Sequence, residues 1–229
     1  DENRTLIPLS SVSPHLIQAT IAIEDKDFYS HHGFSLTGIT RAVLANSKEE
    51  TIQQGGSTIT QQLVKNRLLS PERTIQRKIR ELILSIVTEG VYNKDEILEM
   101  YLNQVPYGGS TYGAEEAAWR YFNKSARDLT LAEAALLAGL PAAPSVYSPF
   151  GSNPELAFSR QEEVLRRMLE DGYISEQQFS EAKKMDIVFA EDKIDIEAPH
   201  FVMYVKKLLA EKYGEDVLQT AGFELRTTL

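Results

Sequence analysis

The stretch that decides the fold is residues 13–25, SPHLIQATIAIED. The serine–proline pair at its start is typical of a helix N-terminus, because serine suits the N-cap and proline suits the first helical position. Ile17 and Ile21 follow at helical spacing, and Glu24 continues the same face. The pattern therefore predicts an apolar helix that ends in a carboxylate.

Helical patterns dominate the rest of the chain. Capping-box patterns begin at Thr130 and Ser175, and an asparagine–proline pair at 153–154 repeats the N-terminal device. We expect further helices at about 58–69, from 70–71 onward, and at 94–103, 114–122, 131–139, 154–170, 176–184 and 199–213. Strand-like runs are few, at about 186–190 and 223–229. The predicted fold class is mainly α.

Composition limits the possible functions. The chain has 229 residues and 42% hydrophobic content, enough for one large domain or two lobes with a sizeable core. Its net charge of −9 disfavours a nucleic-acid coat, so no nucleic-acid partner is expected. The absence of cysteine excludes disulfides and thiolate metal sites. No apolar run is long enough to cross a bilayer, and residues 222–229 resemble the start of a strand or linker leading to a further region.

The first candidate for chemistry is residues 24–33, EDKDFYSHHG. Glu24 lies near a helix C-terminus and on an apolar face, and both surroundings should raise the pKa of its carboxyl group and make it a better base. The alternative is an ordinary solvated acidic helix end. His31 and His32 suggest a metal site, but further ligands at suitable spacing are missing, so hydrogen bonding that fixes a turn before Gly33 is favoured.

The second candidate is residues 55–66, GGSTITQQLVKN. Two glycines let the backbone approach a ligand, and the helix that follows offers free N–H groups to an anion. The segment lacks the Gly-Lys-Ser/Thr of a nucleotide P-loop, which disfavours nucleotide binding. A plain loop with a serine cap is the alternative.

The third candidate is a basic cluster within an acidic protein. Six positive residues lie close together in the sequence: Lys65, Arg67, Arg73, Arg77, Lys78 and Arg80. They could clamp an anion. Lys78 and Glu81 are three residues apart, so they share a face of a helix beside an apolar stripe at Ile75, Ile79, Leu82, Ile83 and Ile86. The alternative is a solvated ion pair of little energetic value.

Taken together, these segments resemble the peptidoglycan glycosyltransferase family, the polymerase module of class A penicillin-binding proteins and of monofunctional transglycosylases. Five ordered signatures carry the resemblance over residues 24–149: ED…F…HHG at 24–33, GGSTITQQ at 55–62, RKIRE at 77–81, YLN with Gly108, Gly113 and YFNK at 101–124, and LAE through LP to APS and Pro149 at 131–149. Ala142 and Val64 depart from residues common in relatives.

The resemblance implies a lysozyme-like helical large lobe and a smaller membrane-proximal jaw lobe roughly within residues 34–75. Residues 1–221 would form the glycosyltransferase domain. The implied reaction polymerises lipid II with inversion and expels polyprenyl pyrophosphate. The implied partners are lipid II, the growing lipid-linked glycan, the membrane surface and other cell-wall synthesis proteins. The expected location is the outer face of the bacterial cytoplasmic membrane, held by a transmembrane segment outside this sequence.

The resemblance also implies roles for individual residues. Glu24 would be the general base, and Glu81, matching the second family glutamate, would organise Lys78 or the pyrophosphate-binding groups. Lys65, Arg73 and Lys78 would stabilise the leaving pyrophosphate. The donor site would be lined by Gly56, Ser57, Thr58, Gln62 and Asn66. No obligatory metal is expected, although a divalent cation, Mg or Mn, could bridge the diphosphate.

The sequence leaves two other functions open. A lytic hydrolase of the same lysozyme-like class would use a carboxylic acid to protonate a sugar leaving group, and it would need no cationic clamp. A helical module that only binds membranes or partner proteins would use the basic helix for anionic head groups and would not need Glu24.

Overall fold

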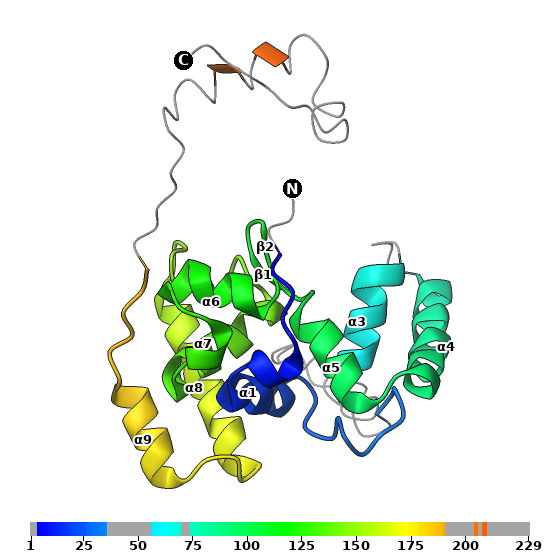
Figure 1. Ribbon diagram of the computed structural model, residues 1–229, viewed down its shortest axis with the longest axis horizontal. Helices are drawn as coiled ribbons and strands as arrows, with labels where there is room; N and C mark the ends of the chain where they lie inside the picture. The colour runs from blue at the N-terminus through cyan, green and yellow to red at the C-terminus, as the bar shows by residue number, and fades with distance from the viewer. Residues whose placement is uncertain (1–3, 36–55, 70–73, 191–203, 206–207, 210–229) are drawn as a thin grey trace, which may run out of the picture. The chain divides into compact units, whose positions relative to one another are not determined.

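The computed structural model describes residues 4–35, 56–69, 74–190, 204–205 and 208–209. The chain divides into two compact units, Asp1–Ala190 and Glu191–Leu229, and the first holds every labelled helix and strand described below. Among its described residues this unit contains eight α-helices and one two-stranded antiparallel sheet (Figure 1). The predicted fold class, mainly α, is confirmed.

The predicted helices lie close to the observed ones. Their bounds are α1 (Pro14–Glu24), α3 (Ile59–Leu68), α4 (Ile75–Val91), α5 (Lys94–Leu102), α6 (Ala114–Phe122), α7 (Leu131–Gly139), α8 (Glu155–Glu170) and α9 (Glu176–Lys184). Short 3-10 helices are η1 (Leu9–Ser11), η2 (Ala126–Asp128) and η3 (Leu140–Ala142). The capping boxes at Thr130 and Ser175 are present as predicted. Pro154 is the N-cap residue of α8 rather than its first helical residue, so the helix starts one residue later than expected.

The core forms around α1, α7 and α8, which pack against one another (Figure 1). On α1, Leu16 and Ala19 are completely buried, and on α8 so are Val164 and Leu165. Nearly all of α7 is buried, in keeping with its run of alanine and leucine. This packing fixes the C-terminal end of α1, and therefore Glu24, beside α8.

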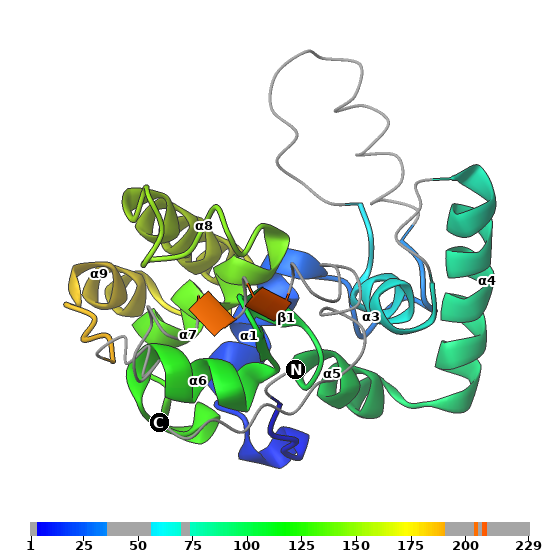
Figure 2. The same ribbon diagram turned by 90° about the horizontal axis from the view of Figure 1, so that it is seen from above.

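A second group of helices is formed by α3, which packs against both α4 and α5 (Figure 2). The burial of α4 is the reverse of a usual amphipathic helix. Its apolar residues Ile75 and Ile83 are 82% and 55% exposed, whereas Glu81 is 1% exposed and Ser85 is fully buried. The predicted apolar stripe exists, but four of its five residues, Ile75, Ile79, Ile83 and Ile86, have exposed side chains.

The strand predicted at 186–190 is wrong, because these residues have no regular structure. Their alternation reflects packing of single side chains on the core: the ring of Phe189 stacks on that of Phe122, and the Ala190 N–H donates to the carbonyl of Tyr121. The sequence interpretation also missed a small hairpin, β1 (Pro106–Gly108) and β2 (Thr111–Tyr112). Gly109 and Ser110 form its turn, and Gly108 and Gly109 have positive φ angles.

Other predictions fall wholly or partly outside the described residues. Within the expected helix 199–213, residues 204–205 and 208–209 are helical. The strand at 223–229, the boundary at 221 and most of the jaw lobe at 34–75 lie in segments that the structure does not describe. Arg73 lies there as well.

Candidate active site

A cleft of about 450 Å³ opens at the C-terminal end of α1. Its walls come from α1 and the turn after it, the segment 56–65, the turn around η3, and α8. Of the residues predicted for the site, Glu24, Gly56, Ser57, Thr58, Gln62 and Lys65 line it. The two signature segments, residues 24–33 and 55–66, therefore meet in one cavity.

The Glu24 carboxylate is held at one oxygen only. Its Oε2 accepts a hydrogen bond of 2.6 Å from Nε2 of Gln62, whereas its buried Oε1 has no partner among the described residues. Burial raises the pKa of Glu24, while Gln62, Arg160 and Lys65 act against the rise. The predicted direction of the pKa shift is confirmed, with burial as its main cause. The negative charge of the carboxylate is therefore stabilised by a hydrogen bond at only one of its two oxygens among the described residues.

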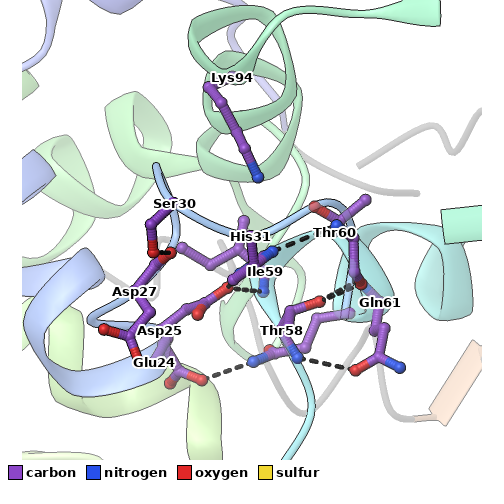
Figure 3. Close-up of polar contacts among 12 residues, drawn as sticks. Glu24, Asp25, Asp27, Ser30, His31, Thr58, Ile59, Thr60, Gln61 and Lys94 are labelled. Atoms are coloured by element: carbon purple, nitrogen blue, oxygen red, sulfur yellow. Dashed lines mark hydrogen bonds and ion pairs between the residues drawn. The ribbon is translucent and has the colours of Figure 1, made fainter. Parts of the chain in front are cut away.

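The neighbouring carboxylate, Asp25, serves a different purpose (Figure 3). Its Oδ2 accepts from the backbone N–H of Ile59 at 3.0 Å and lies 2.8 Å from Nε2 of His31. Nδ1 of His31 accepts from the N–H of Gly33 at 3.2 Å, which puts the proton of a neutral ring on Nε2. Asp25 thus links the end of α1 to the start of α3. His31 holds the turn before Gly33 by hydrogen bonding, as the sequence predicted.

Gly33 allows the closest packing in this region. Its φ is +90°, and a Cβ here would lie 2.9 Å from the carbonyl oxygen of Ser85 on α4. Its own carbonyl accepts from Oγ1 of Thr58 at 2.9 Å. Only glycine satisfies both the backbone conformation and the contact.

The start of α3 does not offer the free N–H groups that we expected for an anion. The N–H of Ile59 donates to Asp25, and the N–H of Gln61 donates to Oγ1 of Thr58 in a capping box. Two of the first three helical N–H groups are therefore occupied by side chains of the protein. An anion in this cleft has to be held mainly by side chains.

A charged cluster on α4 is hydrogen-bonded to Ser57, a residue that lines the cleft. The buried Glu81 pairs with Nζ of Lys78 and accepts from Nη1 of Arg77 at 2.8 Å. Nζ of Lys78 also donates to Oγ of Ser57 at 3.2 Å, and Ser57 lines the cleft. Neither Glu81 nor Lys78 lines the cleft, and Asn66 is exposed on α3 outside it. Glu81 has the geometry of a residue that positions Lys78.

The sequence interpretation missed the wall formed by α8. Arg160, Glu163 and Arg167 line the cleft from this helix. Arg160 is 9% exposed, donates to Oε2 of Glu163 at 2.7 Å and lies with its guanidinium 5.5 Å from the ring centre of Tyr147. Their spacing of three and four residues places them on one face of the helix. This spacing is the feature of the sequence from which a charged wall could have been predicted. Ala142 also lines the cleft, so one departure from the family pattern falls within the site.

No group of three or more His, Asp or Glu side chains in the described residues could hold a metal ion. No helix within the described part of the chain is both long and apolar enough to cross a membrane.

Comparison with known proteins identifies close relatives. A family model described as "Transglycosylase" matches residues 1–169. The chain is 44% identical over its full length to penicillin-binding protein 1A of Neisseria gonorrhoeae and 43% identical, over 93% of its length, to that of Aquifex aeolicus. It spans only 29% of each of these proteins.

A solved structure shares the architecture. The crystal structure of penicillin-binding protein 1A from Haemophilus influenzae aligns with 94% of this chain and 22% of that chain. The TM-score is 0.54 and the sequence identity is 27%. The likeness agrees with a lysozyme-like helical lobe.

Proposed function

Since this chain belongs to the transglycosylase family, in the form found in class A penicillin-binding proteins, we propose that it polymerises lipid II into the glycan strands of peptidoglycan. The observation that carries the proposal is the state of Glu24. Its carboxylate accepts one hydrogen bond from Gln62, has a raised pKa and lines a cleft that also contains Lys65 and Arg160. Such a site suits a reaction in which a hydroxyl loses a proton and an anion departs.

In the proposed reaction, the 4-hydroxyl of the acceptor sugar attacks C1 of the lipid-linked donor. The new C1–O bond forms as the bond from C1 to the pyrophosphate oxygen breaks, with inversion at C1. The Glu24 carboxylate receives the hydroxyl proton. Its raised pKa brings this carboxylate closer to the pKa that is useful for a base at neutral pH.

The leaving group is an anion and needs positive charge more than a proton. Lys65 lies on the cleft wall, and Lys78 lies behind Ser57. We propose that both ammonium groups stabilise the departing pyrophosphate, and we assign Arg73 to the same task from the family resemblance alone. Glu81 would hold Lys78 in place. A divalent cation, Mg or Mn, could assist at the diphosphate but is not proposed as obligatory.

We further propose that the exposed apolar face of α4 contacts the outer surface of the bacterial cytoplasmic membrane, where a polyprenyl substrate resides. Changing both Ile79 and Ile83 to glutamine should weaken binding to lipid vesicles by about tenfold, because each exposed isoleucine contributes apolar area to the contact. Sedimentation with neutral phosphatidylcholine vesicles would measure the change. Val188→Gln, at a site 80% exposed outside α4, is the matched control and should bind like the wild type. Equal binding by both variants would contradict this contact.

The proposed reaction is tested by incubating the protein with lipid II in detergent and separating the products by size. We expect polymer and free polyprenyl pyrophosphate. Cleavage of preformed glycan without polymer would favour the lytic hydrolase, and binding of lipid II without turnover would favour a binding module. Either result would overturn the proposed function.

A further inference from the structure

We propose that Tyr101 is a positioning residue for Glu24 and acts through the side-chain amide of Gln62. The proposal rests on the assigned role of Glu24 as the base of the proposed reaction. It adds a residue that does not line the cleft.

Three helices contribute one residue each to a hydrogen-bonded chain. The hydroxyl of Tyr101, on α5, donates to Oε1 of Gln62 at 3.2 Å. Nε2 of Gln62, on α3, donates to Oε2 of Glu24 at 2.6 Å. Tyr101 is 1% exposed, so its hydroxyl cannot exchange this partner for bulk water.

The direction of donation matters because an amide can present either end. An ionised carboxylate only accepts hydrogen bonds, so it requires the NH2 end of Gln62. If the amide turned over, its oxygen would face Glu24, and the phenolic proton of Tyr101 would lose its acceptor in a buried position. Tyr101 therefore favours the orientation in which Gln62 stabilises charged Glu24.

The phenol keeps its proton throughout this arrangement. Burial raises the pKa of Tyr101 well above its ordinary value, and the charge of Glu24 adds to the rise. Other groups that face Glu24 act on it by charge: Lys65 from α3, Arg160 from α8 and Asp25 from the end of α1. The phenols of Tyr101 and Tyr107 complete this environment. Removing only the hydroxyl of Tyr101 leaves every one of these charges in place.

Tyr101→Phe tests the proposal with a single lost hydroxyl. We expect the pKa of Glu24 to rise by about 0.5–1 unit, because a fixed donor to the carboxylate becomes free to turn. Carboxylate ¹³C NMR titration of the purified protein measures this pKa without substrate. In lipid II polymerisation, the acid limb of kcat should move to higher pH by the same amount, whereas merely structural damage would lower kcat equally at all pH values.

Two further variants make the test specific. In a Gln62→Ala background, Tyr101→Phe should no longer shift the pKa of Glu24, since the connecting amide is gone. Tyr107→Phe should not shift it either, because Tyr107 is equally buried near Glu24 but makes no hydrogen bond to Gln62 within the described residues. An unchanged pKa in Tyr101→Phe, or an equal shift with and without Gln62, would overturn the proposal.

The outcome stays informative if Tyr101→Phe does not fold. Fluorinated tyrosine at position 101 keeps the ring and strengthens its donor, so the pKa of Glu24 should fall instead, and no shift would contradict the proposal. If the NMR shifts occur in a protein that makes no polymer, the proposed function fails while the positioning role of Tyr101 stands.

Discussion

Glu24→Gln is expected to reduce lipid II polymerisation at least about 100-fold, the usual contribution of a positioned general base. Glutamine keeps the shape of the side chain, and its oxygen can still accept from Gln62. It cannot take the hydroxyl proton. The measurement is kcat in a continuous polymerisation assay, with lipid II binding measured separately and expected to remain largely intact.

The control removes a comparable charge from the same cleft. Asp27→Asn, at another cleft-lining carboxylate, should leave kcat within a few-fold of the wild type. If Glu24→Gln retains normal turnover, Glu24 is not the base.

The raised pKa of Glu24 also determines how activity and stability should change with pH. The activity should fall as the pH drops through that pKa, because the base becomes protonated. In the folded protein Glu24 binds its proton more tightly than in the unfolded chain, so its contribution to stability is lost as the pH rises through the folded-state pKa. At neutral pH the buried charge costs folding free energy, and Glu24→Gln should unfold at a temperature no lower than the wild type.

Lys78→Ala is expected to lower kcat about 100-fold, at the lower end of the effect of removing one charge-stabilising donor. The side chain of Lys78 is half exposed, so solvent weakens its field relative to a buried group. Arg77 still pairs with Glu81 in this variant, so the unfolding temperature should change little. Single-turnover kinetics with lipid II would separate the chemical step from binding.

Lys184→Ala, an exposed lysine in the last turn of α9, removes the same charge far from α4 in the sequence and should polymerise normally. Lys78→Arg should retain more activity than Lys78→Ala. A turnover for Lys78→Ala equal to that of Lys184→Ala would remove Lys78 from the mechanism.

Much of the fold could be predicted because its helices begin with local signals. Thr130 and Ser175 satisfy backbone N–H groups within their own turns, so their effect is visible in sequence. The orientation of α4 could not be predicted in this way. Its pattern shows two faces, but Glu81 is inside because Arg77 and Lys78 neutralise it, a tertiary compensation that periodicity does not record.

The site was only half visible in the sequence. Glu24 and Gln62 belong to recognisable segments, and the structure brings them into contact. Arg160 and Arg167 were not among the predicted site residues, because their spacing indicates a shared helix face but does not show that the face lines a cleft. The same limit applies to Ile59, whose backbone N–H is consumed by a carboxylate from another helix.

Adjacent carboxylates in this protein have opposite requirements. Glu24 has one oxygen without a hydrogen-bond partner among the described residues, whereas Oδ2 of Asp25 is bound to the backbone of α3 and to His31. We expect a change at Asp25 to shift Gln62 relative to Glu24, because Asp25 holds the start of the helix that carries Gln62. A loss of activity on substitution would therefore have a different cause at each of the two positions, and an acidic residue that cannot be replaced here would not by itself be a participant in proton transfer.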